Sequence, residues 1–182
     1  MEKIQVKERM IQLSNYVTVR KEDSLIEVFE ALEQARKSEN ERAHRDAIVV
    51  DANGVFVGKL TMIDIFLALE PNYKKIEKQQ KKGFLTSEFV MKAAKDFNLW
   101  MEPTQTICER GSRLKVADVM HIPEKLEYIK ETDLLEKALH LYVMGVHQPL
   151  IVKNNDNQVT GVLRFGDIFE AIRQSLLKCD VS

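Results

Sequence analysis

Cysteine is scarce in this sequence, with two residues, Cys108 and Cys179, in a chain of 182. Two cysteines are too few for a disulfide scaffold, and neither belongs to a CxxC or CxxxC pair that could bind zinc. Glycine and proline are also few, with seven and four residues, well below the ~12% of average composition. These shortages exclude collagen-like and low-complexity chains, so we expect a globular protein whose cysteines are reduced thiols.

Charge of one sign is not in excess either. The chain has 27 lysines and arginines against 28 aspartates and glutamates, a formal net charge of −1, so no overall field attracts a polyanion and we expect no nucleic-acid partner. No apolar run approaches the ~20 residues that cross a bilayer. Met1 is followed by charged residues rather than by the apolar segment of a signal peptide. We therefore expect a cytoplasmic protein without a membrane partner.

The sequence does contain an internal repeat. Residues 58–69, GKLTMIDIFLAL, match residues 161–172, GVLRFGDIFEAI, in the glycine, a leucine, the aspartate, the Ile-Phe pair and an alanine. A short apolar run precedes each segment, at 48–50 and at 150–152, and turn residues follow each run. This order predicts a strand, a hairpin turn and a second strand in each copy.

A helix is predicted ahead of each strand pair. Apolar residues keep the i, i+3, i+4, i+7 spacing of one helix face at 25–32 and again at 135–142. Each copy therefore reads strand, helix, strand, turn, strand, helix. The N-cap boxes expected at the helix starts pair Ser24 with Glu27 and Asp133 with Glu136, and the strands expected before them span 16–19 and 126–129.

These repeated segments resemble the cystathionine-β-synthase (CBS) domain, which occurs in tandem as a regulatory unit often called a Bateman module. The hallmark of the family is Gly-h-h-Thr/Ser-x-x-Asp at the start of the last helix, where h is apolar. Residues 58–64 fit it except at Lys59, and residues 161–167 fit it except that Arg164 replaces the hydroxyl residue. Residues 117–120, ADVM, also resemble the Asp-Val-Met segment with which the family's repeats begin.

The resemblance implies an architecture. It predicts a mixed α/β (α+β) fold, in which two tandem CBS-type βαββα repeats pack as one pseudo-two-fold module with a helical insert between them. The first repeat is expected at 7–70, the insert at 71–115 and the second repeat at 116–177.

The resemblance also implies a ligand, because the family binds adenosine-containing molecules in the cleft between two repeats. The turn at 58–64 leads into a helix start, where free N–H groups and the helix dipole attract phosphate. Thr61 could add a hydroxyl donor, and Asp64 can accept hydrogen bonds from both ribose hydroxyls with its two carboxylate oxygens. The same two residues could instead serve only as a helix cap.

The second copy leaves a choice open. Arg164 could bind a polyphosphate bidentately, or it could fill the phosphate pocket with its own stem. His147 lies two residues before Pro149, among the ligand contacts that the family resemblance implies, yet it could equally terminate a helix. The resemblance also implies a contact at Glu127. The predicted nucleotide-binding set is Val17, Thr18, Asp46, Ala47, Lys59, Thr61 and Asp64 in the first copy and Tyr128, His147, Gln148, Pro149, Arg164 and Asp167 in the second.

Other chemistry finds little support. No Gly-x-Ser-x-Gly, P-loop or GxGxxG motif occurs in the sequence, so we expect no enzyme and no catalytic residue. His44, His121, His140 and His147 have no i, i+4 partner and no neighbouring cysteine, so we expect no metal site and no required cofactor.

The insert at 71–115 is too long for an ordinary loop. Apolar residues spaced along one helix face from Val90 to Met101 predict a helix that packs on the module or across a dimer interface. The lysine-rich segment 73–83 predicts a solvated helix ending at Gly83, with a docking patch for an acidic partner or a phosphate tail as the alternative. Residues 102–111 are expected to break the helix and lead back to the second repeat.

The functional prediction is a regulatory sensor. The chain is expected to bind AMP, ADP, ATP or S-adenosylmethionine and to signal through its conformation or its dimer arrangement, with an effector protein as a possible partner. The alternative is a ligand-free dimeric scaffold whose insert recruits a partner.

Overall fold

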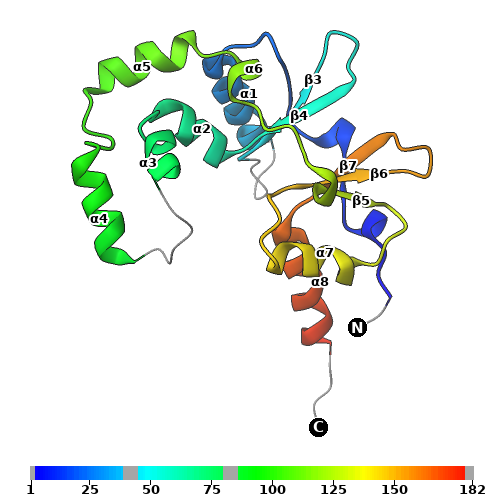
Figure 1. Cartoon of the computed structure of the whole chain (residues 1–182). Coiled ribbons are helices and arrows are strands. Elements are labelled where there is room, and N and C mark those ends of the chain that lie inside the picture. Colours follow the sequence, from blue (N-terminus) through cyan, green and yellow to red (C-terminus); the bar gives the residue numbers. More distant parts are fainter. Residues whose placement is uncertain (1–2, 39–44, 80–85, 179–182) are drawn as a thin grey trace. The chain divides into compact units, whose positions relative to one another are not determined.

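The computed structural model describes residues 3–38, 45–79 and 86–178. These residues form two compact units (Figure 1). The repeat-1 unit comprises residues 17–121, and the repeat-2 unit comprises residues 1–16 and 122–182. None of the helices in the described ranges has the length and apolar character needed to cross a membrane.

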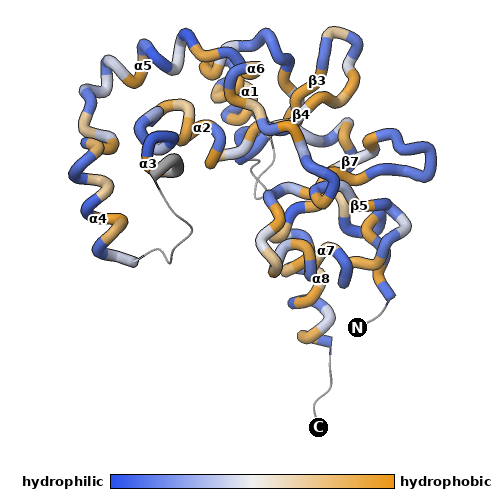
Figure 2. The backbone as a smooth tube through the Cα atoms, in the orientation of Figure 1, coloured by the Kyte–Doolittle hydropathy of each residue, from blue (hydrophilic) through white to orange (hydrophobic). Residues whose placement is uncertain are grey.

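The repeat-1 unit contains a three-stranded sheet in the order β2-β3-β4, with β2 parallel to β3 and β3 antiparallel to β4. Figure 2 shows hydrophobic residues along β3 and β4 and hydrophilic residues at the turn that joins them. Helices α1 and α2 supply the apolar residues, such as Leu25, Val28 and Ile65, that complete the core. The elements are β2 (Thr18–Arg20), α1 (Leu25–Ser38), β3 (Ala47–Val50), β4 (Phe56–Leu60) and α2 (Met62–Leu69).

Local sequence signals explain how these elements begin and turn. The predicted box at the start of α1 is present, because Ser24 N–H donates to Oε2 of Glu27 at 2.6 Å and Glu27 N–H donates to Oγ of Ser24 at 3.3 Å. In the β3–β4 hairpin, Oδ1 of Asp51 accepts the N–H groups of Asn53 and Val55, each at 2.9 Å. Gly54 adopts φ +77°, which glycine tolerates without strain.

The insert folds as separate helices rather than as one apolar stripe. Helix α4 ends at Asp96, and Asn98 and Trp100 adopt positive φ angles of 49° and 58°, so the face predicted from Val90 to Met101 is interrupted. The predicted break at 102–111 is wrong for most of that range, because a new helix begins at Thr104. Gly83 lies outside the described residues. The helices of the insert are α3 (Tyr73–Gln79), α4 (Ser87–Asp96) and α5 (Thr104–Arg113), and α6 (Val116–Val119) follows it.

The repeat-2 unit contains a four-stranded sheet in the order β1-β7-β6-β5. It repeats the β2-β3-β4 arrangement, with β5 parallel to β6 and β6 antiparallel to β7, and adds β1 antiparallel to β7. The elements are η1 (Val6–Glu8), β1 (Ile11–Gln12), η2 (Leu13–Asn15), η3 (Lys125–Glu127), β5 (Tyr128–Lys130), α7 (Leu135–Val143), β6 (Leu150–Lys153), β7 (Val159–Leu163) and α8 (Phe165–Leu177).

Close packing of the backbone explains the glycine at the start of each repeated motif. A Cβ at Gly161 would lie 2.4 Å from the carbonyl oxygen of Ile11 on β1, and a Cβ at Gly58 would lie 2.9 Å from the carbonyl oxygen of His121. A side chain at either position would collide with backbone. Each glycine therefore allows another chain segment to lie against the last strand of its repeat.

Two local predictions are wrong in register. The N-cap of α7 is Leu134 rather than Asp133. The Asp133 carboxylate instead accepts hydrogen bonds from the N–H of Lys130 at 3.0 Å and from Nζ of Lys137 at 2.7 Å. The first strands start two residues later than predicted, at Thr18 and Tyr128, and a 3-10 turn takes the place of the first residues expected in β5.

Candidate functional site

The start of α2 is organised by Thr61 and Asp64. Thr61 donates its N–H to Oδ2 of Asp64 at 2.8 Å and its hydroxyl to the same oxygen at 2.6 Å. The N–H of Asp64 points back to the Thr61 hydroxyl at 3.4 Å. Both capping bonds thus use one carboxylate oxygen. No residue that the structure describes donates a hydrogen bond to the other oxygen, Oδ1.

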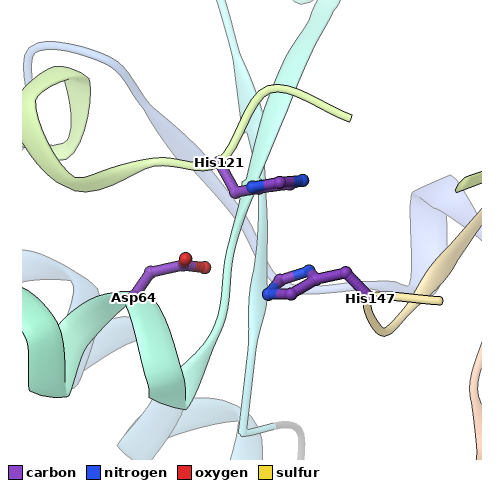
Figure 3. A group of neighbouring side chains, drawn as sticks. All are labelled: Asp64, His121 and His147. Carbon is purple, nitrogen blue, oxygen red and sulfur yellow. The ribbon is translucent and has the colours of Figure 1, made fainter. Parts of the chain in front are cut away.

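His121 lies beside this carboxylate in the same unit. A carboxylate oxygen of Asp64 and a ring nitrogen of His121 lie within 4.8 Å of each other (Figure 3). The backbone of His121 is held against β4, since its N–H donates to the carbonyl of Lys59 at 2.8 Å and its carbonyl accepts the N–H of Lys59 at 2.9 Å. His121 was absent from the predicted site. The signal for it was its position directly after the Asp-Val-Met segment.

The expectation of no metal site rested on spacing along the sequence, which did not reveal that His121 lies beside Asp64. His44 lies outside the described residues.

The remaining predicted residues of the first copy meet at one edge of the sheet. Because β2 runs parallel to β3 and β4 runs antiparallel to it, the beginnings of β2 and β3 lie at the same edge as the end of β4. Ala47 pairs with Leu60 in this register, one residue before Thr61. Val17 precedes β2, and its carbonyl accepts the N–H of Ile48 at 2.8 Å.

Exposure differs among the residues at this edge. Thr18 is exposed, Asp46 is half-buried, and Val17 and Ala47 are buried. Lys59 occupies a position where the family has an apolar residue, and it is fully buried. Burial of a lysine requires that its charge be compensated by neighbouring groups.

The start of α8 carries a different cap. Nε of Arg164 donates to Oδ2 of Asp167 and Nη2 donates to Oδ1, both at 2.9 Å, and the N–H of Arg164 lies 3.3 Å from Oδ2. This is a bidentate pair, in which both carboxylate oxygens accept from one guanidinium. The two side chains are only 20% and 14% exposed. The Arg164 side chain therefore pairs with the aspartate of its own motif, which neither predicted alternative included, and the choice between those alternatives stays a prediction.

The other predicted residues of the second copy lie at the equivalent sheet edge. Tyr128 begins β5, and Pro149 directly precedes β6 and is buried. Nδ1 of His147 lies 3.8 Å from Oε2 of the buried Glu127. Gln148 is exposed. Burial, together with the charge of Glu127, raises the pKa of the Tyr128 phenol.

Tyr142 stabilises this edge, a role that the helix-face pattern did not reveal. Its buried hydroxyl accepts the N–H of Leu150 at 2.8 Å and donates to the carbonyl of Leu163. One side chain of α7 therefore connects the beginning of β6 to the end of β7, directly before the Arg164 cap.

The insert contacts the far end of α2. The N–H of Trp100 donates to Oε2 of Glu70 at 2.8 Å, its indole N–H donates to the hydroxyl of Tyr73 at 3.0 Å, and its ring packs edge-on against Phe66 with 6.1 Å between centroids. Trp100 thus packs on the repeat, as one of the two alternatives predicted. Val90 and Met101 of the expected stripe are exposed, and so are the nearby Phe89 and Met91.

A family model described as the CBS domain matches residues 6–71 and 116–174. The chain belongs to the CBS-domain family. The predicted resemblance and the mixed α/β fold are thereby confirmed. The domain boundaries at 7–70, 71–115 and 116–177 stay predictions, as does the packing of the repeats into one pseudo-two-fold module.

Solved structures of CBS proteins share this fold. The CBS-pair protein CBSX2 from Arabidopsis thaliana is 19% identical, with a TM-score of 0.62 over 96% of this chain and 98% of that one. CBSX2 in complex with AMP is 20% identical, with a TM-score of 0.58 over 94% and 98%. The CBS domain of a bacterial CNNM/CorC family Mg²⁺ transporter in complex with ATP is 16% identical, with a TM-score of 0.59 over 94% and 89%.

These similarities indicate a regulatory type of module and point to no enzymatic family. A search of the curated proteins found no match.

Proposed function

We propose that this chain is a regulatory sensor that binds an adenine nucleotide or an adenosyl ligand at the start of α2. The main observation behind the proposal is that the two oxygens of the Asp64 carboxylate differ in their hydrogen bonds. Oδ2 caps the helix, and no described residue donates a hydrogen bond to Oδ1. Similar structures that hold AMP and ATP support the choice of ligand class.

The geometry suits each part of such a ligand. Oδ2 of Asp64 already accepts two capping hydrogen bonds, so the two lone pairs of Oδ1 are the ones that can accept charge-assisted hydrogen bonds from the ribose hydroxyls. The first N–H groups of α2 and the positive end of its dipole can hold phosphate. The exposed Thr18 and the half-buried Asp46, at the beginnings of neighbouring strands, can contact adenine, whereas Val17 and Ala47 belong to the core.

The proposed role of the ligand is regulatory rather than catalytic. Ligand binding favours one conformation or dimer arrangement by its differential affinity, and no further cofactor is required. AMP, ADP, ATP and S-adenosylmethionine are the candidates, and an effector protein or the dimer itself reads the change.

A homodimer is part of the proposal. Helices α1 and α2 expose Phe29, Met62 and Phe66 on the repeat-1 unit. A groove of about 550 Å³ lies beside these residues, with Arg36 and Arg45 among its polar lining. Exposed apolar faces of this kind favour association with a second copy. A light-scattering mass of one chain at micromolar concentration would reject the dimer.

The second candidate function is a ligand-free scaffold, favoured by one observation on the insert. Helix α4 exposes Phe89, Val90 and Met91 in succession, and an apolar surface on a helix can recruit a partner. In this case the repeats would supply only a dimer surface.

Thermal melts separate the two functions. A ligand at 100 times its dissociation constant adds ~2.7 kcal/mol to the free energy of unfolding. The sensor predicts a higher melting temperature with at least one of AMP, ADP, ATP and S-adenosylmethionine. Inorganic phosphate and adenine, each alone, serve as controls. If none of the four ligands raises the melting temperature, the scaffold is the better account.

A further inference from the structure

The two repeats present the same helix start with different side chains. The N-cap residue is extended in both, with φ −107° and ψ 167° at Thr61 and φ −94° and ψ 155° at Arg164. An aspartate follows at the third helical position of both α2 and α8, and its carboxylate receives the backbone N–H of the cap residue. The backbone frames are therefore equivalent, and the difference lies in the cap side chain.

That difference decides how much of each carboxylate is available. The Thr61 hydroxyl takes one oxygen of Asp64, whereas the Arg164 guanidinium takes both oxygens of Asp167 at 2.9 Å. A ribose needs two acceptor positions on the aspartate, one for each hydroxyl. At α8 a ribose would have to displace a fork of two parallel charge-assisted hydrogen bonds.

The environment makes this displacement unfavourable. Arg164 and Asp167 are 20% and 14% exposed, so water screens their attraction little. The planar guanidinium is always charged and matches a carboxylate without further ordering. A neutral diol offers the carboxylate no charge to replace the one it would displace.

We propose that Arg164 closes the repeat-2 site from within, so that the chain binds one nucleotide, at repeat 1. The inference rests on the proposed function and adds to it the number of sites and the residue that sets this number. Arg164 is a specificity-determining residue here, because it acts by occupying Asp167 rather than by contacting a ligand.

The test exchanges the cap residues of the two repeats, because Thr61 is the residue at the site proposed to be open. Isothermal titration with AMP is expected to give one site per chain in the natural protein. Arg164→Thr is expected to give two sites, and Thr61→Arg is expected to lose the site at repeat 1. The double variant is expected to have one site again, now at repeat 2.

The matched control is Arg173→Ala on the same helix. Arg173 forms the same kind of i, i+3 bidentate pair with Glu170, at 2.8 and 2.7 Å, but on the exposed face. This variant is expected to keep one site. Circular dichroism confirms that each variant folds, and Arg164→Ser serves as the second opening variant if Arg164→Thr does not.

Particular results would overturn the inference. Two AMP sites in the natural protein would show that Arg164 closes nothing. One AMP site but two ATP sites would show that Arg164 binds the polyphosphate instead. A folded Arg164→Thr or Arg164→Ser protein that gains no site also rejects closure, whatever the natural protein binds. Failure of the proposed function gives a different result. In that case the natural protein has no AMP site that Thr61→Arg can remove.

Discussion

Replacing Asp64 with alanine separates the two roles of this carboxylate, which caps α2 and is proposed to bind ribose. Oδ2 accepts two capping hydrogen bonds, at 2.8 and 2.6 Å, and loss of a cap lowers the free energy of unfolding by about 0.5–2 kcal/mol. A charge-assisted hydrogen bond from ribose contributes ~1.5–3 kcal/mol, which corresponds to a loss of about 10- to 140-fold in affinity. The fold is expected to remain, since one cap is a small part of its stability.

The assay pairs calorimetric titration with chemical denaturation. Asp118→Ala is the control variant, because Asp118 occupies the same cap-box position on α6 of the same unit and is exposed. It is expected to lower stability slightly and to leave AMP affinity unchanged. 2′-Deoxy-AMP is the control ligand: the natural protein should bind it more weakly than AMP, and Asp64→Ala should no longer distinguish the two.

One result would refute the reasoning. If Asp64→Ala lowers stability while its affinity for AMP stays the same and it still distinguishes the deoxy ligand, then Asp64 is a helix cap and the ribose is bound elsewhere.

Three further predictions test the packing of the two units and of the insert. Tyr142→Phe removes a buried hydroxyl that serves two strands, and we expect about 1–3 kcal/mol of lost unfolding free energy in urea titrations. Gly161→Ala places a Cβ 2.4 Å from a backbone oxygen of β1 and should lose about 1–3 kcal/mol or more. Gly166→Ala meets no atom within 4 Å and should not lose stability; equal effects of the two would refute the packing argument. Glu70→Ala removes the acceptor of the Trp100 N–H, so the fluorescence of this single tryptophan should change, and an unaltered spectrum would show that the insert does not depend on Glu70.

Sequence patterns were most informative where neighbouring residues decide the structure. The hairpin turns followed from residues such as Asp51, whose side chain bonds the backbone two and four positions ahead. The α1 cap followed from Ser24 and Glu27 for the same reason. The helix predicted from Val90 to Met101 is shorter in the structure, because it ends at Asp96 and Asn98 adopts a left-handed backbone conformation. Apolar periodicity alone does not reveal such a conformation.

The sequence by itself determined that one unit occurs twice, which family the unit resembles, and that the two copies differ at Thr61 and Arg164. Only the tertiary structure decided what those residues do. It placed β1 against Gly161 and His121 beside Asp64, and it turned the Arg164 guanidinium onto both oxygens of Asp167. The reason is that repeats and caps arise from residues a few positions apart. Strand pairing between distant segments, and the direction of a long side chain, depend on what the folded chain brings next to them.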